Sequence, residues 1–337
     1  MAKFLKIGAV QAMRMNQCSA YNPRTKEIIC GYKENKIEGL CDIVVYSYTT
    51  KQLLRKYLNL TGLYHCNDMT VSSDNKLYIA TMGSGETRDA VTCFNLSNMS
   101  RVGLMKVKMR DNSIFKGIAG VACNQASIQN KGNDKFAFAG WGISGSDYTR
   151  IAITDSDFNE QGSFEVKRNN RTFQTIEYKD GYIFVHFNQE IDIFDEDGKL
   201  IRIIKPYSSA YEGEGIFVID NKLYYTIITI GSDASYSYEA YIHEIDMKIY
   251  NNIAIYPDGA EPDYYCADFF SLISNKLGKS CICVPYSQYL KGELNGTNVY
   301  SFGGALLNKY PEKKIFAGSN RYDTAKQVLD YLKNNQI

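Results

Sequence analysis

The chain has 337 residues, and its 38 lysines and arginines nearly balance its 37 aspartates and glutamates, for a formal net charge of +1. This balance argues against nucleic acid as a partner, because neutralising phosphates takes a cationic excess or stripe. No apolar run approaches the roughly 18 residues that span a bilayer, and the apolar start at Met1–Ile7 is too short for a secretory signal, so we expect no membrane insertion and no signal peptide.

Six stretches of the chain share one pattern, a polar turn followed by a short apolar strand. In chain order they are residues 22–30, 74–80, 133–139, 179–185, 220–226 and 275–283. Asn, Asp and Gly in the turns favour tight hairpins, and the Ile, Val, Tyr and Phe that follow suit a half-buried pleated surface. The pattern recurs about every 51 residues, which is typical of a four-stranded propeller blade. The sequence therefore predicts an all-β protein, a β-propeller with six counted modules.

The periodicity changes from strand to helix only near the end of the chain. Asp323 is a candidate N-cap, and four apolar residues between Ala325 and Leu332 recur at helical spacing. We expect a β-propeller over residues 1–318 and a short C-terminal helix in residues 319–337, packed on the propeller or on a partner subunit.

Loops rich in glycine, serine and acidic residues follow the strands of three modules, at residues 83–89, 142–148 and 231–239. Equivalent loops of a propeller lie on one face, so these should converge. Their hydroxyl, carboxylate and aromatic groups are those that bind sugars by hydrogen bonds and ring packing. The candidate ligand-binding residues here are Trp141, Asp147, Tyr148, Tyr236 and Tyr238. Solvated hairpin loops without a ligand are the alternative.

A second group of candidates lies where the inner strands of the propeller would begin, at the mouth of its central channel. It consists of His65, Asn67, Asp68, Gln174, Glu212 and Glu214. Side chains of this kind at one end of the channel would form a polar ligand-binding ring. The alternative is that they cap strands and satisfy backbone groups between blades.

Motifs for metal binding and catalysis are missing from the sequence. The nine cysteines include no CxxC pair, the three histidines have no HxxxH or HExxH spacing, and no nucleophile elbow, phosphate-binding loop or dinucleotide motif is present. We expect no metal, no cofactor and no catalytic residue, and cysteines that are mostly buried and free. The paired acids Glu212 and Glu214 leave a polysaccharide-cleaving enzyme as an alternative.

The segments His65–Thr70 and Asn75–Ala80 resemble a known propeller family. The family comprises receptor-binding tail proteins of phages that infect Gram-positive bacteria, together with the teichoic-acid biosynthesis protein C group. It shows a His-x-Asn-Asp-hydrophobic entry, then a turn and a Leu-Tyr-Ile/Val strand, and later blades place an acid or amide before a strand, as Gln174–Ile176 and Glu214–Ile216 do. The family is often five-bladed, so five blades are an alternative to the six counted modules.

The resemblance implies a phage tail protein of the virion, assembled in the host cytoplasm, that binds cell-wall glycan and particularly teichoic acid. Its partners would include other virion proteins, with a homo-oligomer left open, and a structural virion scaffold is a further alternative. Because teichoic acids are polyanionic and the chain is nearly neutral, phosphate contacts would come from local basic residues. The candidates are Arg88, Arg150, Arg168, Arg171 and Lys291.

A second, shorter likeness lies at Lys314–Ala325, which is similar to the opening signature of the clostridial type-2 cell-wall-binding repeat. That module needs several further strands and helices and normally occurs in tandem copies. The chain stops soon after this one signature, so we expect no working repeat and interpret the match as chance or a relic.

Overall fold

The computed structural model of the chain describes residues 2–8, 14–34, 39–126, 133–188, 190–204, 206, 211–219, 222–229, 239–246, 250–256, 281–285, 296–302, 315–316, 326–327 and 330. The chain divides into two compact units, Met1–Met247 and Lys248–Ile337. Within the described ranges, no helix has the length and apolar character needed to cross a membrane.

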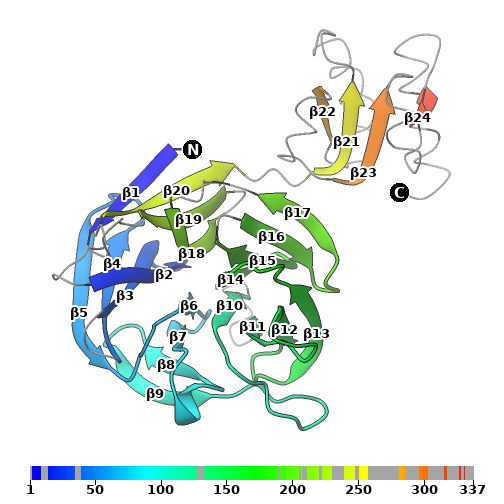
Figure 1. The fold of residues 1–337 in the computed structure, drawn as a ribbon. Coiled ribbons are helices and arrows are strands. Elements are labelled where there is room, and N and C mark those ends of the chain that lie inside the picture. Colours follow the sequence, from blue (N-terminus) through cyan, green and yellow to red (C-terminus); the bar gives the residue numbers. More distant parts are fainter. Residues whose placement is uncertain are drawn as a thin grey trace. The chain divides into compact units, whose positions relative to one another are not determined.

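The first unit is a five-bladed β-propeller, in which four-stranded antiparallel sheets are arranged in a ring around a central axis (Figure 1). Blade I contains β2 (Arg14–Asn22), β3 (Glu27–Glu34), β4 (Leu40–Ser47) and β5 (Leu53–Thr61). Blade II contains β6 (Asp68–Val71), β7 (Lys76–Ala80), β8 (Val91–Asn95) and β9 (Ser100–Met105), with the 3-10 turn η1 (Gly85–Thr87) between β7 and β8. Blade III contains β10 (Gly120–Asn124), β11 (Lys135–Trp141), β12 (Tyr148–Thr154) and β13 (Glu160–Lys167). Blade IV contains β14 (Phe173–Lys179), β15 (Tyr182–Phe187), β16 (Glu190–Asp195) and β17 (Leu200–Ile204).

Blade V closes the ring with strands from both ends of the first unit. It contains β18 (Tyr211–Ile219), β19 (Lys222–Thr229) and β20 (Glu239–Asp246), and β1 (Ala2–Gly8) pairs antiparallel with β20 as its outermost strand. Figure 1 shows β1 beside β20, although these strands lie at opposite ends of the unit's sequence. Pairing the two ends in one sheet locks the ring.

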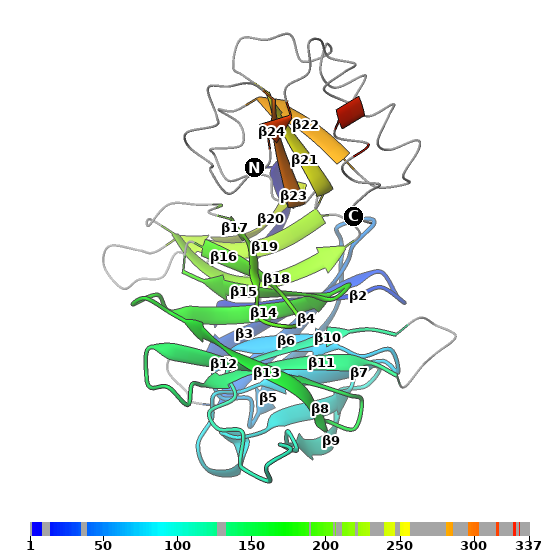
Figure 2. The ribbon, with the colours of Figure 1, turned by 90° about the vertical axis from the view of Figure 1, so that its right-hand side faces the viewer.

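Hydrophobic clusters fill the interfaces between neighbouring blades. Ile29 of blade I and Ile79 of blade II belong to one such cluster, and Phe184 of blade IV and Leu223 of blade V belong to another. The middle strands of a blade are therefore covered on both faces, and β4 is buried along most of its length. The outermost strand β5 is largely exposed. Figure 2 shows the blades from the side.

The predicted turn chemistry is confirmed between β6 and β7 and between β14 and β15. Asn75 has a φ of 66°, and the Asp180–Gly181 pair has φ values of 51° and 81°. Asn, Asp and Gly tolerate this left-handed region better than other residues, and two such residues in a row close a two-residue hairpin of type I′. The repeated polar turns thus define the hairpins of the blades.

The propeller fold is confirmed with five blades, and the sixth counted module belongs to a different sheet. In the second unit, β21 (Tyr250–Tyr256), β22 (Cys281–Pro285), β23 (Gly296–Phe302) and β24 (Ile315–Phe316) form a sheet in the order β22-β21-β23-β24, with every pair parallel. A propeller blade is antiparallel, so these strands are no blade. The observed boundary at Met247/Lys248 thus precedes the expected one after residue 318.

The expected C-terminal helix falls almost entirely outside the described residues. Within residues 319–337 only Lys326, Gln327 and Asp330 are described, and these three are helical and exposed.

Candidate functional site

The five inner strands β2, β6, β10, β14 and β18 line the channel, and we call the end at which they begin the entry face and the other end the exit face. Two predicted residues at the entry face connect blades through buried hydrogen bonds. Asp68 Oδ2 accepts from the backbone amides of Val121 (3.0 Å) and Ile176 (2.9 Å), and Oδ1 accepts from Met69 N (2.9 Å). These bonds tie β6 to β10 and β14, and Asp68 has no exposed surface.

Asn67 makes the same kind of connection one residue earlier. Its Nδ2 donates to the carbonyl oxygens of Ala119 and Gln174, each at 2.7 Å. Of the two interpretations drawn from the sequence, bonding between blades is the one that the hydrogen bonds of Asn67 and Asp68 show. Their polar atoms hold the ring together.

Four other predicted residues meet at the entry face around Lys33. Gln174 Nε2 donates to Glu212 Oε1 (3.2 Å), and the charges of Glu212 and Lys33 both act on the nearly buried Glu214. Burial, reinforced by Glu212, raises the pKa of Glu214 well above its ordinary value. Burial and the Lys33 ammonium lower the pKa of His65 to about 4, so His65 is neutral at pH 7.

A separate cavity of about 540 Å³ opens on the same face, beside the channel, and brings together Trp141 and Tyr148. It lies between the blades, since its lining runs from Ala119 before β10, through the end of β11 and the start of β12, to Phe173 at the start of β14. Its volume falls within the roughly 300–1,000 Å³ of ligand pockets. The other lining residues are Met82, Gly117, Gly140, Gly142, Gly145, Ser146, Thr149, Arg168 and Thr172. We call this cavity the Trp141 pocket.

The indole of Trp141 is contacted from two directions, while about half of the residue stays exposed. The Arg88 guanidinium carbon lies 3.9 Å from the ring centroid, a cation–π contact. Gly117 has a φ of 62°, and a Cβ there would come within 2.4 Å of the indole nitrogen, so only glycine leaves room for the ring. The backbone amide of Trp141 donates to Lys116 O (2.9 Å), and the residue remains 53% exposed. An ordered, exposed aromatic face is the result.

Arg168 gives the Trp141 pocket a second cation. Its Nε is buried and has no hydrogen-bond partner among the described residues. Asp147, the third predicted residue of this loop, accepts from Arg168 N (2.8 Å) through its carbonyl and from Asn170 N (3.3 Å) through its carboxylate. Asp147 therefore braces the segment that carries Arg168.

Of the other basic candidates, two are engaged in ion pairs. Arg171 Nη1 contacts Glu190 and Asp192 Oδ2 (2.8 Å), and Arg150 Nη2 lies 3.5 Å from Glu160 Oε1. Lys291 lies outside the described residues, as do Tyr236 and Tyr238. Arg88 and Arg168 are thus the two predicted cations that the structure brings to the exposed tryptophan.

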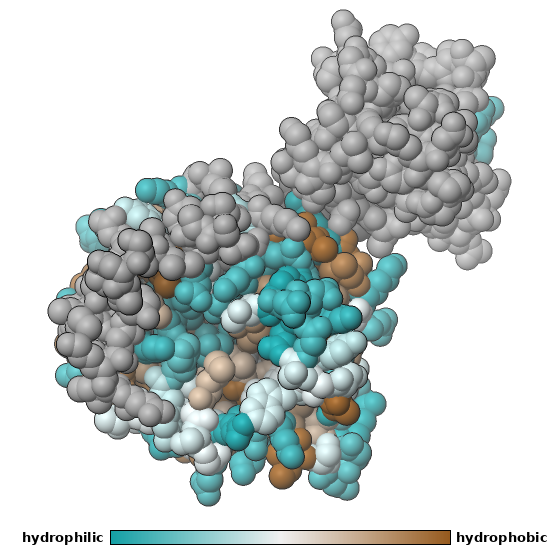
Figure 3. Space-filling view, in the orientation of Figure 1, coloured by the Kyte–Doolittle hydropathy of each residue, from teal (hydrophilic) through white to brown (hydrophobic). Residues whose placement is uncertain are grey.

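Lys33, Met82 and Gly117 are residues of the candidate sites that no sequence motif indicated. Gly117 could have been noticed as a glycine ahead of an inner strand, but nothing in the local pattern indicates which aromatic ring it accommodates. On the face that Figure 3 shows, the coloured residues are mostly hydrophilic, with separate hydrophobic patches.

Fold and site together define a five-bladed β-propeller with an aromatic and cationic pocket on its entry face. No model of a protein family matches the sequence, and no curated protein matches it. Among solved structures, the WD40 domain of Neurospora crassa Pan2 is similar over 73% of this chain and 68% of its own, with a TM-score of 0.40 and 8% identity. The structure of U3-55K is similar over 67% of this chain and 64% of its own, with a TM-score of 0.40 and 8% identity. A Bacteroides caccae protein of unknown function is similar over 62% of this chain and 70% of its own, with a TM-score of 0.33 and 13% identity. Similarity at these identities concerns the fold alone.

Proposed function

We propose that this chain is a non-enzymatic binding protein that recognises a bacterial cell-surface glycan in the Trp141 pocket. The observation that carries the proposal is the exposed Trp141 ring beside Tyr148, held by Gly117 and Arg88. A sugar ring packs its C–H face on an aromatic ring and uses its hydroxyls for hydrogen bonds, for which the pocket offers Ser146 and Thr149.

The two arginines favour a glycan that carries phosphate. Arg88 lies over the indole, and Arg168 lines the same pocket with a buried donor that has no partner among the described residues. Guanidinium groups bind phosphate oxygens through paired, charge-assisted hydrogen bonds. Teichoic acids combine sugars with phosphates, so we propose them as the preferred class of ligand.

The biological setting that we propose comes from the resemblance at His65–Ala80. In that setting the chain is a tail component of a phage that infects Gram-positive bacteria, assembled with other virion proteins in the host cytoplasm. Recognition of the host wall would then be the purpose of the pocket.

Replacing Trp141 with alanine is expected to weaken binding to Gram-positive cell walls by about five- to thirtyfold, because stacking on an exposed aromatic supplies roughly 1–2 kcal/mol. The measurement is cosedimentation of the full chain with intact walls and with walls stripped of teichoic acid. Ile143→Ala is the matched control, since Ile143 is 73% exposed, lies two residues away and does not line the pocket. Equal binding of both variants and the unaltered protein would contradict the proposal.

The same incubations address the alternative of a polysaccharide-cleaving enzyme. The feature that favours this alternative is the pair of acids Glu212 and Glu214 near the start of β18, where burial raises the pKa of Glu214, because a general acid requires a protonated carboxyl. Shortening of the wall polymer that Glu214→Gln stops would establish cleavage in place of simple binding.

A further inference from the structure

A second cavity, of about 410 Å³, lies at the opposite end of the channel. The strands β10 and β14 show this. Ala119, just before β10, and Phe173, at the start of β14, line the Trp141 pocket. Gln125, just after β10, and Lys179, at the end of β14, line the second cavity. All five blades contribute to its lining. We call it the exit-face cavity. Neither the proposed glycan binding nor the ring of interblade hydrogen bonds accounts for it.

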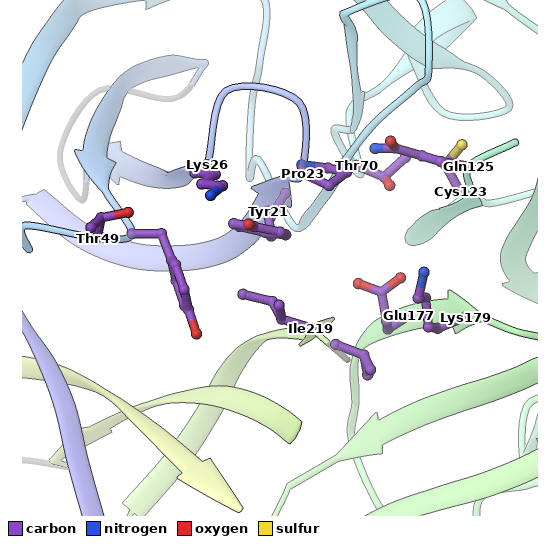
Figure 4. A pocket seen from close by; sticks show the side chains of 13 residues that line it. Tyr21, Pro23, Lys26, Thr49, Thr70, Cys123, Gln125, Glu177, Lys179 and Ile219 are labelled. Carbon is purple, nitrogen blue, oxygen red and sulfur yellow. The ribbon is translucent and has the colours of Figure 1, made fainter. Parts of the chain in front are cut away.

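Basic side chains enter the exit-face cavity from two sides. Figure 4 shows Lys26 and Tyr21 of blade I on one side, and Glu177 and Lys179 of blade IV on another. Lys179 Nζ lies 3.6 Å from Asp180 Oδ1, but the Asp180 side chain is 70% exposed, so solvent screens this ion pair and weakens it.

The acid in the cavity, Glu177, offsets little of that charge at neutral pH. Burial raises its pKa to about 8, against opposing effects of the Tyr178 amide, which donates to its Oε1 at 2.8 Å, of Lys179 and of the Val218 amide. The negative charge of Glu177 also helps to raise the pKa of two buried groups on neighbouring strands, the Asp68 carboxyl and the Cys123 thiol. The neutral carboxyl is a hydrogen-bond donor, so the cavity combines two cations with an O–H group.

An aromatic and apolar wall completes the cavity. The rings of Tyr21 and Tyr48 meet edge to face, with centroids 5.4 Å apart, and the Tyr48 hydroxyl is fixed by the Tyr224 hydroxyl at 2.9 Å. Val218 and Ile219 add aliphatic surface. Preformed, partly apolar walls with a few converging polar groups are the usual features of a small-molecule site.

We propose that the exit-face cavity binds a small organic anion, one whose phosphate or carboxylate group lies between Lys26, Lys179 and the Glu177 carboxyl and whose ring packs against Tyr21 and Tyr48. The site is independent of the Trp141 pocket. It makes the propeller a protein with two binding faces, one for a polymer and one for a small anionic molecule.

Titration calorimetry of the full chain with phenyl phosphate, benzoate and uncharged phenol tests this proposal. We expect saturable binding of one or both anions at pH 7 and no binding of phenol. Binding of phenyl phosphate but not of benzoate would assign the site to phosphate esters. Binding of benzoate but not of phenyl phosphate would assign it to carboxylates. Lys26→Met and Lys179→Met should each weaken binding about tenfold, the effect of losing one charge-assisted hydrogen bond. Lys106→Met, at an exposed lysine outside the cavity, and Trp141→Ala should leave binding unchanged.

The pH dependence of anion binding distinguishes direct contact of Glu177 with the anion from a purely structural role of this residue. Between pH 7 and pH 9 the ionising Glu177 should repel the anion and weaken its binding, whereas Glu177→Gln, which mimics the neutral acid, should bind equally at both values. Absence of saturable binding for both anions would overturn the proposal, as would binding that neither lysine substitution weakens.

Discussion

Replacing Asp68 with alanine is expected to lower the free energy of unfolding by about 4 kcal/mol or more, because a buried amide without an acceptor costs about 1–3 kcal/mol and Asp68 accepts from three of them. Two of these amides, those of Val121 and Ile176, belong to blades III and IV, so the substitution breaks contacts between blades rather than a local turn. Urea denaturation of the full chain measures the change.

Two further variants, one at Asp68 and one at an exposed control position, test whether the hydrogen bonds of Asp68 carry this effect. Asp68→Asn keeps one acceptor oxygen and should cost less than the alanine variant, since part of the network survives. Asp157→Ala, at an exposed aspartate of blade III, should change the stability by no more than about 0.5 kcal/mol. An alanine variant at position 68 that is as stable as the unaltered protein would show that these hydrogen bonds do not hold the blades together.

Deleting Ala2–Gly8 is expected to lower the stability by roughly 5 kcal/mol, which for a domain of this size is a fall in Tm of roughly 10–20 °C. The deletion removes the outermost strand of blade V, including Ile7, which is fully buried, and Leu5, which is 8% exposed. It also uncovers Ile242 on β20, which belongs to the same cluster. Differential scanning calorimetry gives the Tm.

A synthetic peptide with the sequence of Ala2–Gly8 should restore part of the lost Tm when it is added to the truncated chain, because it can pair with the free edge of β20. A peptide in which Leu5 and Ile7 are replaced by serine is the matched control and should restore nothing. An unchanged Tm after the deletion would contradict the role of β1 as the strand that closes the ring.

The blade pattern was predictable because polar turns and apolar strands are local features. Asn75 and Asp180–Gly181 take the left-handed backbone that their residue types favour, and the strands after them are buried as their composition suggests. The direction of pairing is different. Cys281–Pro285 is a short apolar run that suits a buried parallel strand as well as an antiparallel one. For this reason the turn-and-strand pattern predicted a sixth module there.

Contacts between distant residues also limited what could be predicted about ring closure and the candidate site. The pairing of β1 with β20 and the contact of Arg88 with Trp141 depend on the closed ring, and no local pattern encodes them. Asn67 and Asp68 were predicted where the inner strands begin, which is the end called the entry face here. Only the observed distances distinguish a ligand-binding ring from bonds between blades. Residue type and strand position are local, whereas the partners of a side chain are set by the fold.

The most direct test of glycan binding uses the intrinsic fluorescence of Trp141, because the chain contains a single tryptophan. Solubilised teichoic acid from Gram-positive walls would be titrated into the full chain, with a neutral soluble polysaccharide as the control. We predict a saturable shift of the emission to shorter wavelength, since a sugar stacked on the half-exposed indole removes water from it. An emission spectrum that stays unchanged to saturating glycan would contradict the assignment of the Trp141 pocket as the glycan-binding site.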